Sequence, residues 1–141
     1  RLIKETMKIT ICGSIKFYDE ILKTKEQLEK LGHEVLIPVK AQKVDYWKED
    51  NTKRVEAKKK FGFISEHLDK IEESDAVLVV NMTKNEIKNY IGANTFLEMG
   101  FAYYRKKKIY TLNPLPNQPY IIDELLTFEP IVVNDNYKTI K

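Results

Sequence analysis

The stretch AVLVVNM, residues 76–82, is a run of apolar side chains interrupted only by Asn81. Apolar residues at consecutive rather than alternate positions are typical of a parallel strand that is covered on both faces. Strand and helix patterns alternate on either side of this run. We therefore expect an α/β fold in which residues 76–82 form a central strand.

Four other stretches have the composition of strands, and helical spacing of apolar residues separates them. The strands are expected at residues 8–12 (KITIC), 34–38 (EVLIP), 108–112 (KIYTL) and 130–133 (PIVV). The helices are expected at residues 17–32, 55–73, 95–104 and 120–126. Five strands joined in this way favour a flavodoxin-like, doubly wound five-stranded parallel sheet in a single domain.

The composition fits one globular domain. The chain has 141 residues, of which 43% are hydrophobic and 32% are charged, and its net charge of +3 is too small to favour nucleic acid as the main partner. No apolar run approaches the ~18–20 residues of a membrane span. The single cysteine, Cys12, fits a reducing, cytoplasmic environment. Residues 1–6 are expected to be a native N-terminal extension or a cloning remnant, and residues 7–141 the domain.

Polar residues follow several of the predicted strands at the edge where ligands bind in open parallel sheets. Gly13 and Ser14 follow the first strand, Asn81 closes the third and Asn113 follows the fourth. Glu98 belongs to the helix that begins at this edge. We expect these groups to converge on one crevice.

His67 is expected near the same crevice, because it lies about eight residues back along the helix that ends near Ser74, a rise of ~12 Å. A histidine at this place acts as a proton carrier or is a helix-surface residue. Asp75 opens the third strand at the opposite edge and is expected to be a turn residue. His33, after Gly32, is expected to be structural.

Glu98 has two interpretations. Residues 95–98, TFLE, match a capping box in which Thr95 caps the helix and Glu98 returns to its amide. Alternatively, the apolar flanks of Glu98 and the helix start at the ligand edge indicate a desolvated carboxylate, kept ionised by the helix dipole. Such a group is a nucleophile suited to a sugar carbon with oxocarbenium character.

Three motifs in order resemble the nucleoside 2-deoxyribosyltransferase superfamily, which includes the 2′-deoxynucleoside 5′-phosphate N-hydrolases. They are ICGSI at the end of the first strand, SDAVLVV in the third, and G-x-N-T-x-x-E-M-G-x-A in the following helix. The resemblance covers about residues 8–113. It implies a flavodoxin-like domain, a nucleoside or nucleotide substrate, no cofactor, and a homodimer or tetramer in which a neighbouring subunit often completes the site.

The resemblance also implies roles for individual residues. Glu98 matches the catalytic glutamate that attacks the anomeric carbon of the deoxyribose. The loop against the sugar or its 5′-phosphate and the start of the helix supply the implied substrate-binding residues Gly13, Ser14, Ile15, Lys16, Gly92, Asn94 and Thr95.

Three positions depart from the family pattern. Gly92 stands where phosphate-specific relatives have a serine, and Thr10 where the family usually has a tyrosine. His67 stands where an aspartate usually helps to protonate the leaving base. From reference pKa values near 6.5 for histidine and 4.3 for glutamate, a His67–Glu98 pair is expected to be most active at mildly acidic to neutral pH.

The alternatives to this enzyme are a non-catalytic nucleotide- or nucleoside-binding module and a phosphoribohydrolase of the cytokinin-activating type, whose G-x-G-T-x-x-E motif is similar. Neither G-x-G-x-x-G nor G-x-x-x-x-G-K is present. No metal site is expected from two distant histidines and one cysteine. The basic segment at residues 39–60 is long enough to be a lid or a solvated loop. Tyr103, Tyr104 and Tyr110 are expected to contribute to subunit contacts.

Overall fold

The computed structural model describes residues 6–39, 52, 55, 56, 59 and 62–141. Its centre is a five-stranded, all-parallel sheet in the order β2-β1-β3-β4-β5. The strands are β1 (Lys8–Cys12), β2 (Glu34–Leu36), β3 (Ala76–Val79), β4 (Lys108–Thr111) and β5 (Ile131–Val132). This is the order of the flavodoxin-like doubly wound folds, so the predicted fold class is confirmed.

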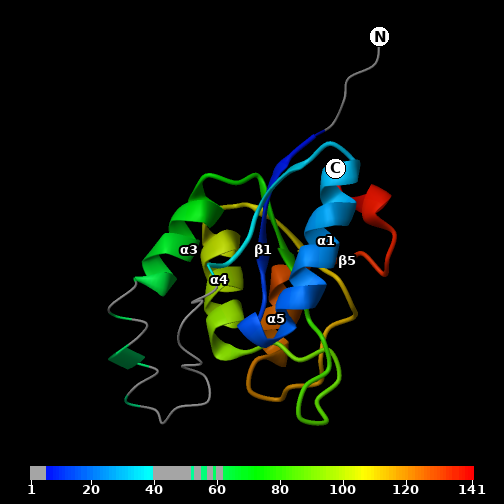
Figure 1. The fold of residues 1–141 in the computed structure, drawn as a ribbon. Helices are drawn as coiled ribbons and strands as arrows, with labels where there is room; N and C mark the ends of the chain where they lie inside the picture. Colours follow the sequence, from blue (N-terminus) through cyan, green and yellow to red (C-terminus); the bar gives the residue numbers. More distant parts are fainter. Residues whose placement is uncertain (1–5, 40–51, 53–54, 57–58, 60–61) are drawn as a thin grey trace.

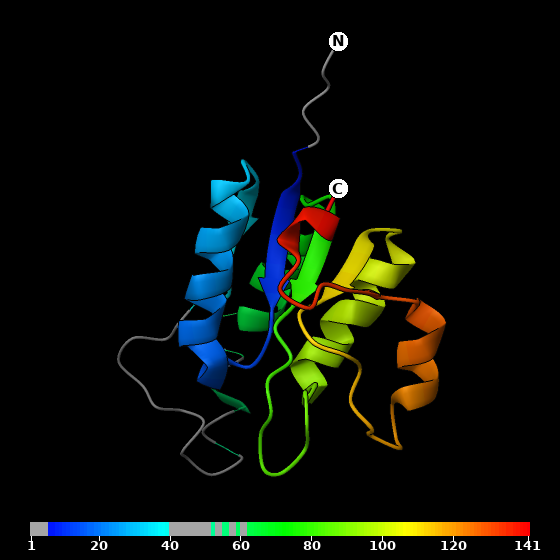
Figure 2. The same cartoon turned by 90° about the vertical axis from the view of Figure 1, so that its right-hand side faces the viewer.

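Helices cover both faces of the sheet (Figure 1). The helices and 3₁₀ turns are η1 (Ile15–Phe17), α1 (Tyr18–Lys30), α3 (Phe63–Glu72), α4 (Ala93–Tyr104), α5 (Ile122–Phe128) and η3 (Tyr137–Thr139). Helix α1 packs on one face, while α3 and α4 pack on the other, with α5 beside α4 (Figures 1 and 2). No helix among the described residues is both long and apolar enough to span a membrane.

Strand β1 divides its side chains between the two hydrophobic cores. Ile9 and Ile11 belong to the cluster that includes Ile21 and Leu28 of α1. Cys12 belongs to the opposite cluster, formed by residues of β3, α3, α4 and α5. Because successive side chains of a strand point to opposite faces, the last residue of β1 lies beneath α3 and α4.

Helix α4 begins two residues earlier than the sequence predicted. Its first residue is Ala93, and Gly92 precedes it in an extended conformation without a side-chain cap. Thr95 is therefore already inside the helix, and Glu98 lies in the second turn. A capping box needs the threonine at the cap itself, so the capping-box interpretation of Thr95 and Glu98 is wrong.

Helix α3 also differs from its predicted pattern. Its buried residues are His67 and Ile71, whereas Ile64, which the sequence pattern places on one helix face with Leu68 and Ile71, is 39% exposed. His67 is thus not a helix-surface residue. The segment expected to be a lid, residues 39–60, lies almost wholly outside the described residues, and its role stays a prediction.

The tyrosines expected at subunit contacts separate into two groups. Tyr103 and Tyr104 are 50% and 77% exposed, but Tyr110 is 1% exposed and belongs to the core. The prediction that Tyr110 contributes to a subunit contact is therefore wrong. The expected homodimer or tetramer stays a prediction that depends on the exposed tyrosines of α4.

Asn81 joins the chain after β3 to the chain after β4. Its side chain is fully buried, and its Oδ1 accepts a hydrogen bond of 2.9 Å from the Asn113 amide. Its Nδ2 donates to the carbonyls of Asn113 (2.9 Å) and Pro114 (3.1 Å). In return, the Asn113 side chain donates to the Asn81 carbonyl at 2.9 Å. These bonds hold together the two loops that leave the ligand edge.

Replacing Asn81 by alanine should lower the free energy of unfolding by roughly 2–4 kcal/mol, because each buried polar group left without a partner costs about 1–3 kcal/mol. The measurement is urea denaturation. The exposed Asn117 provides the control, since Asn117→Ala removes the same atoms from the surface and should change stability by about 0.5 kcal/mol or less. Equal effects of the two substitutions would contradict the structural role of Asn81.

Candidate active site

A pocket of about 590 Å³ opens at the carboxyl edge of the sheet. This volume lies within the range of small-molecule sites, roughly 300–1,000 Å³. The loop after β1, the first half of α3 and the start of α4 form its walls. The predicted site residues that line it are Gly13, Ser14, Ile15, Lys16, His67, Gly92, Asn94, Thr95 and Glu98.

Asn81 and Asn113 do not line this pocket, so their predicted convergence with Glu98 is wrong. The reason is that both polar atoms of the Asn81 side chain already form hydrogen bonds that join two loops, so they do not face the pocket. Asn113 faces a separate hollow, together with Lys16 and Met82 among others. Position at the end of a strand placed these residues at the correct edge but did not show which way their side chains turn.

Gly13 lets the loop after β1 pass close to the sheet. A Cβ atom at this position would lie 3.1 Å from the carbonyl oxygen of Val80, which is closer than ordinary packing permits. Ser14 then caps the 3₁₀ turn η1 by accepting a hydrogen bond of 3.3 Å from the Lys16 amide. This turn carries Ile15 and Lys16 to the pocket wall.

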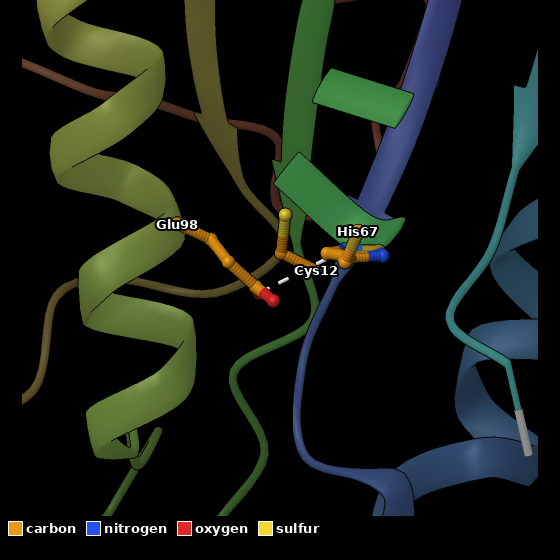
Figure 3. Close-up of side chains that lie close together, drawn as sticks. All are labelled: Cys12, His67 and Glu98. Atoms are coloured by element: carbon orange, nitrogen blue, oxygen red, sulfur yellow. Dashed lines mark ion pairs between the residues drawn. The ribbon is translucent and has the colours of Figure 1, made fainter. Parts of the chain in front are cut away.

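Three side chains from three elements meet at the floor of the pocket (Figure 3). Glu98 projects from α4 toward Cys12 at the end of β1 and His67 of α3. The distance from His67 Nε2 to Glu98 Oε1 is 3.8 Å, and one donor atom from each of the three residues lies within 4.8 Å of the other two. Cys12 is fully buried, and the side chains of His67 and Glu98 are 7% and 15% exposed.

Burial dominates the acidity of Glu98. It raises the pKa of this carboxyl to about 8, and the hydrogen bond from the Cys12 thiol opposes the rise. From its place near the start of a helix, Glu98 is expected to be kept ionised by the helix dipole. Glu98 lies in the second turn of α4, where the dipole has already weakened, so desolvation dominates and the carboxyl holds its proton at neutral pH.

His67 responds to the same burial in the opposite direction. The pKa of its imidazole is lowered to about 4, mainly by burial and also by the charge of Lys70, while a poorly aligned hydrogen bond with the Ile11 backbone opposes the shift. Neither ring nitrogen forms a hydrogen bond with good geometry to a described residue. The order of the two pKa values is thus the reverse of that expected from reference peptides, and the proton of the pair resides on Glu98.

Cys12 is a site residue that sequence reasoning missed. Burial raises the pKa of its thiol well above the usual value, and the nearby charge and hydrogen bond of Glu98 raise it further. The sequence did contain a signal, since Cys12 is the last residue of a strand that leads into the Gly13–Ser14 loop. Its significance depended on knowing which face of the sheet α4 covers.

Three lysines and Glu66 line the pocket, and because Lys70 lies 3.6 Å from a carboxylate oxygen of Glu66, the positive character of the pocket comes mainly from Lys16 and Lys84. Burial lowers the pKa of Lys84, and the like charge of Lys16 lowers it further. The Lys84 Nζ lies 4.9 Å from the centre of the Tyr90 ring. Lys84 and Tyr90 were not among the predicted site residues, because the loop between β3 and α4 has no regular spacing to interpret.

Comparison with known proteins supports the fold. A 2-deoxyribosyltransferase from the psychrotolerant bacterium Bacillus psychrosaccharolyticus is similar in structure, with a TM-score of 0.51 and 19% sequence identity over 74% of this chain and 70% of that one. The chain is similar in fold to a 2-deoxyribosyltransferase. A CMP N-glycosidase of Clostridium botulinum aligns with a TM-score of 0.49 and 20% identity, over 86% of this chain and 82% of that one.

No protein-family model and no curated protein matches the sequence. At 19% identity, the likeness to the 2-deoxyribosyltransferase shows a common fold alone. It agrees with the family that the three sequence motifs resemble. The combination of Cys12, His67 and Glu98 is described from the geometry of this chain.

The Glu98 carboxyl is predicted to titrate near pH 8 in metal-free buffer. Carbon-13 NMR of protein labelled at glutamate carboxyls, compared with a Glu98→Gln sample, would identify its resonance. Cys12→Ala should raise the midpoint because the thiol no longer donates to the carboxylate, and Cys12→Ser should keep the midpoint close to that of the wild type. A midpoint between pH 4 and 5 in the wild type would contradict the burial of this group.

Proposed function

We propose that the protein cleaves the N-glycosidic bond of a nucleoside or nucleoside 5′-monophosphate, by hydrolysis or base transfer, with Glu98 as the nucleophile. The observation that carries the proposal is the position of Glu98 at the floor of the pocket, largely desolvated and 3.8 Å from a buried histidine. A carboxyl in this environment loses its water shell before it reacts. The likeness in fold to a 2-deoxyribosyltransferase supports the same reading.

The chemistry requires Glu98 in its ionised form. Its carboxylate oxygen forms a bond to the anomeric carbon of the sugar, while the C–N bond breaks and its electrons move to the base. The base leaves as a neutral molecule only if it gains a proton. Water or a second base then takes the sugar from Glu98 and regenerates the carboxylate.

His67 is proposed to supply the proton. Between about pH 4 and pH 8, His67 and Glu98 together hold one proton, which resides mainly on Glu98. The reactive arrangement has this proton on His67 and a charge on Glu98. Positive charge that develops on the sugar stabilises the carboxylate, so the substrate itself favours the transfer.

The charge of the pocket favours a substrate with a phosphate. Lys16 and Lys84 repel one another in the empty pocket, and an anion between them relieves this repulsion. Gly92 has no side chain to hold a phosphate. The Tyr90 hydroxyl lies 3.5 Å from the place that a Cβ of residue 92 would occupy, so it can offer a hydrogen bond there instead. We therefore expect nucleoside 5′-monophosphates to be better substrates than nucleosides.

Glu98→Gln should abolish release of free base from a panel of nucleosides and nucleoside monophosphates, measured by chromatography. The loss should be at least about 10³-fold, because an amide cannot act as the nucleophile. Glutamine has nearly the same size as glutamate, so the packing should not change. Glu124→Gln, at an exposed position in the first turn of α5, is the matched control and should keep full activity.

If Glu98→Gln retains more than a tenth of wild-type activity, the nucleophilic role of Glu98 is wrong. Tight binding of a nucleotide by the wild-type protein without release of base would instead identify a binding module. Both outcomes contradict the proposal, and binding measured on the same panel distinguishes them.

The pH dependence of kcat/KM in metal-free buffer should be bell-shaped, with limbs near pH 4 and pH 8. Below about pH 4, His67 and Glu98 are both protonated, so Glu98 cannot act as a nucleophile. Above about pH 8, both have lost their protons, so no proton is available for the leaving base. His67→Asn should lower the rate by roughly 10²–10⁴-fold, as is typical for loss of an acid/base group.

The remaining activity of His67→Asn should increase with pH as Glu98 ionises, and it should not fall at alkaline pH as the wild-type activity does. His67→Asp should recover part of the rate, since a carboxyl at this position can again carry a proton. An unchanged rate and profile in His67→Asn would show that the proton has another source.

A further inference from the structure

The groups at the floor of the pocket form a mixed set of sulfur, nitrogen and oxygen donors. No metal site is expected from the sequence alone, because the histidines and the cysteine are far apart in the chain. The fold brings Cys12 Sγ, an imidazole nitrogen of His67 and a carboxylate oxygen of Glu98 within 4.8 Å of one another. We propose that these three side chains bind a divalent transition-metal ion, for which zinc is the best fit.

The distances suit a tetrahedral ion after a small movement. With metal bonds of about 2.3 Å to sulfur and about 2.0–2.2 Å to nitrogen and oxygen, neighbouring ligands lie roughly 3.4–3.6 Å apart. The distance of 3.8 Å between His67 Nε2 and Glu98 Oε1 is already close to this value. The two separations that involve Cys12 Sγ are at most 4.8 Å, so closing them requires side-chain movements of about 1 Å.

The imidazole of His67 independently points to a ligand. Its side chain is 7% exposed, yet neither ring nitrogen forms a hydrogen bond of good geometry to a described residue, and its hydrogen bond with the Ile11 backbone is poorly aligned. Buried polar groups are normally paired, and an exception requires an explanation. A metal ion would accept the Nε2 lone pair. The Ile11 backbone, which raises the pKa of the ring, can help to orient the imidazole, as backbone carbonyls commonly do for metal-bound histidines.

The charge of the site agrees with a divalent ion. Cys12 and Glu98 together supply two negative charges when deprotonated, and a coordinated thiol is deprotonated by the metal itself. Lys70, whose charge lowers the pKa of His67, is directed elsewhere. Its Nζ donates to the Ile37 carbonyl at 2.8 Å and lies 3.6 Å from a carboxylate oxygen of Glu66.

The donor set selects the kind of metal. Thiolate and imidazole favour zinc and similar transition metals, whereas magnesium and calcium prefer oxygen donors alone. Three protein ligands leave a fourth position, and His67 and Glu98 both line the pocket from which it can be filled. Cys12 is fully buried and does not line the pocket, so an ion would reach its sulfur past the side chains of His67 and Glu98.

Metal binding and nucleophilic attack exclude one another at Glu98. A carboxylate oxygen that coordinates zinc is not available to the anomeric carbon, and a coordinated His67 cannot carry the proton. This consequence rests on the proposed function, but the metal site itself does not. Zinc should therefore inhibit glycosidic cleavage, and a chelator should restore it.

The test is a titration of the reduced full-length protein with cobalt(II) in the absence of substrate, followed by absorption spectroscopy. We expect one ion per chain and a thiolate-to-cobalt charge-transfer band. Because Cys12 is the only cysteine of the chain, this band can come only from its sulfur. Addition of one equivalent of zinc should remove the band.

Variants assign the other two ligands. Cys12→Ser should abolish the band, while His67→Asn and Glu98→Gln should weaken binding by more than the roughly 10–100-fold typical of a lost outer-shell partner. The other histidine of the chain provides the control. His33 accepts a hydrogen bond of 3.0 Å from the Met7 amide outside the pocket, and His33→Asn should bind cobalt as the wild type does. Thermal unfolding of each variant shows whether it is folded.

Absence of the thiolate band in the wild-type protein would overturn the proposal, whatever the variants do. An unchanged affinity for cobalt in folded His67→Asn or Glu98→Gln would also overturn it. Because no substrate is present, these results are independent of whether the protein cleaves glycosidic bonds. A protein that binds cobalt in this way but releases no base would retain the metal site and lose only the proposed function.

Discussion

Desolvation of the Glu98 carboxyl is the constraint on which the site depends. In a parallel sheet, the carboxyl end of β1 and the start of α4 lie at the same edge, so the second turn of α4 packs over the last residue of β1. Glu98 therefore faces Cys12 and His67 instead of water. This single contact raises the pKa of the carboxyl, determines which of the pair holds the proton, and brings three metal-binding side chains together.

The sequence predicted the sheet well because its signals are local and strong. Consecutive apolar residues in β3 and alternation in β1 identified a parallel sheet, and the rule for its ligand edge placed Glu98 and His67 in one pocket. The errors concern side-chain direction. Asn81 lies at the correct edge but turns inward to join two loops, and Ile64 lines the pocket instead of the core. These directions depend on packing between elements that are distant in the chain.

The electrostatics of the site could not be predicted from residue types. Reference pKa values place the proton on histidine and the charge on glutamate, and the fold reverses this order because both groups are buried. Burial disfavours whichever form is charged, so it affects an acid and a base in opposite directions. A ligand that brings positive charge, such as a reacting sugar or a metal ion, would stabilise the ionised form of Glu98. The two proposals for this pocket rest on its geometry, and both agree with this electrostatic property.

The two ends of the sheet differ in how fully their buried polar groups are paired. At the amino end of the strands, the Thr10 hydroxyl donates to the Lys70 carbonyl at 3.1 Å and lies 2.6 Å from the Ser74 hydroxyl. At the carboxyl end, the buried side-chain atoms that lack a partner among the described residues are the two ring nitrogens of His67 and the hydroxyl of Thr111, the last residue of β4. An unpaired buried polar group costs about 1–3 kcal/mol, and a fold that needed only stability would replace it. His67 lines the pocket and Thr111 does not, so it is the unpaired imidazole that indicates a site shaped for a ligand, while stability comes from the rest of the sheet.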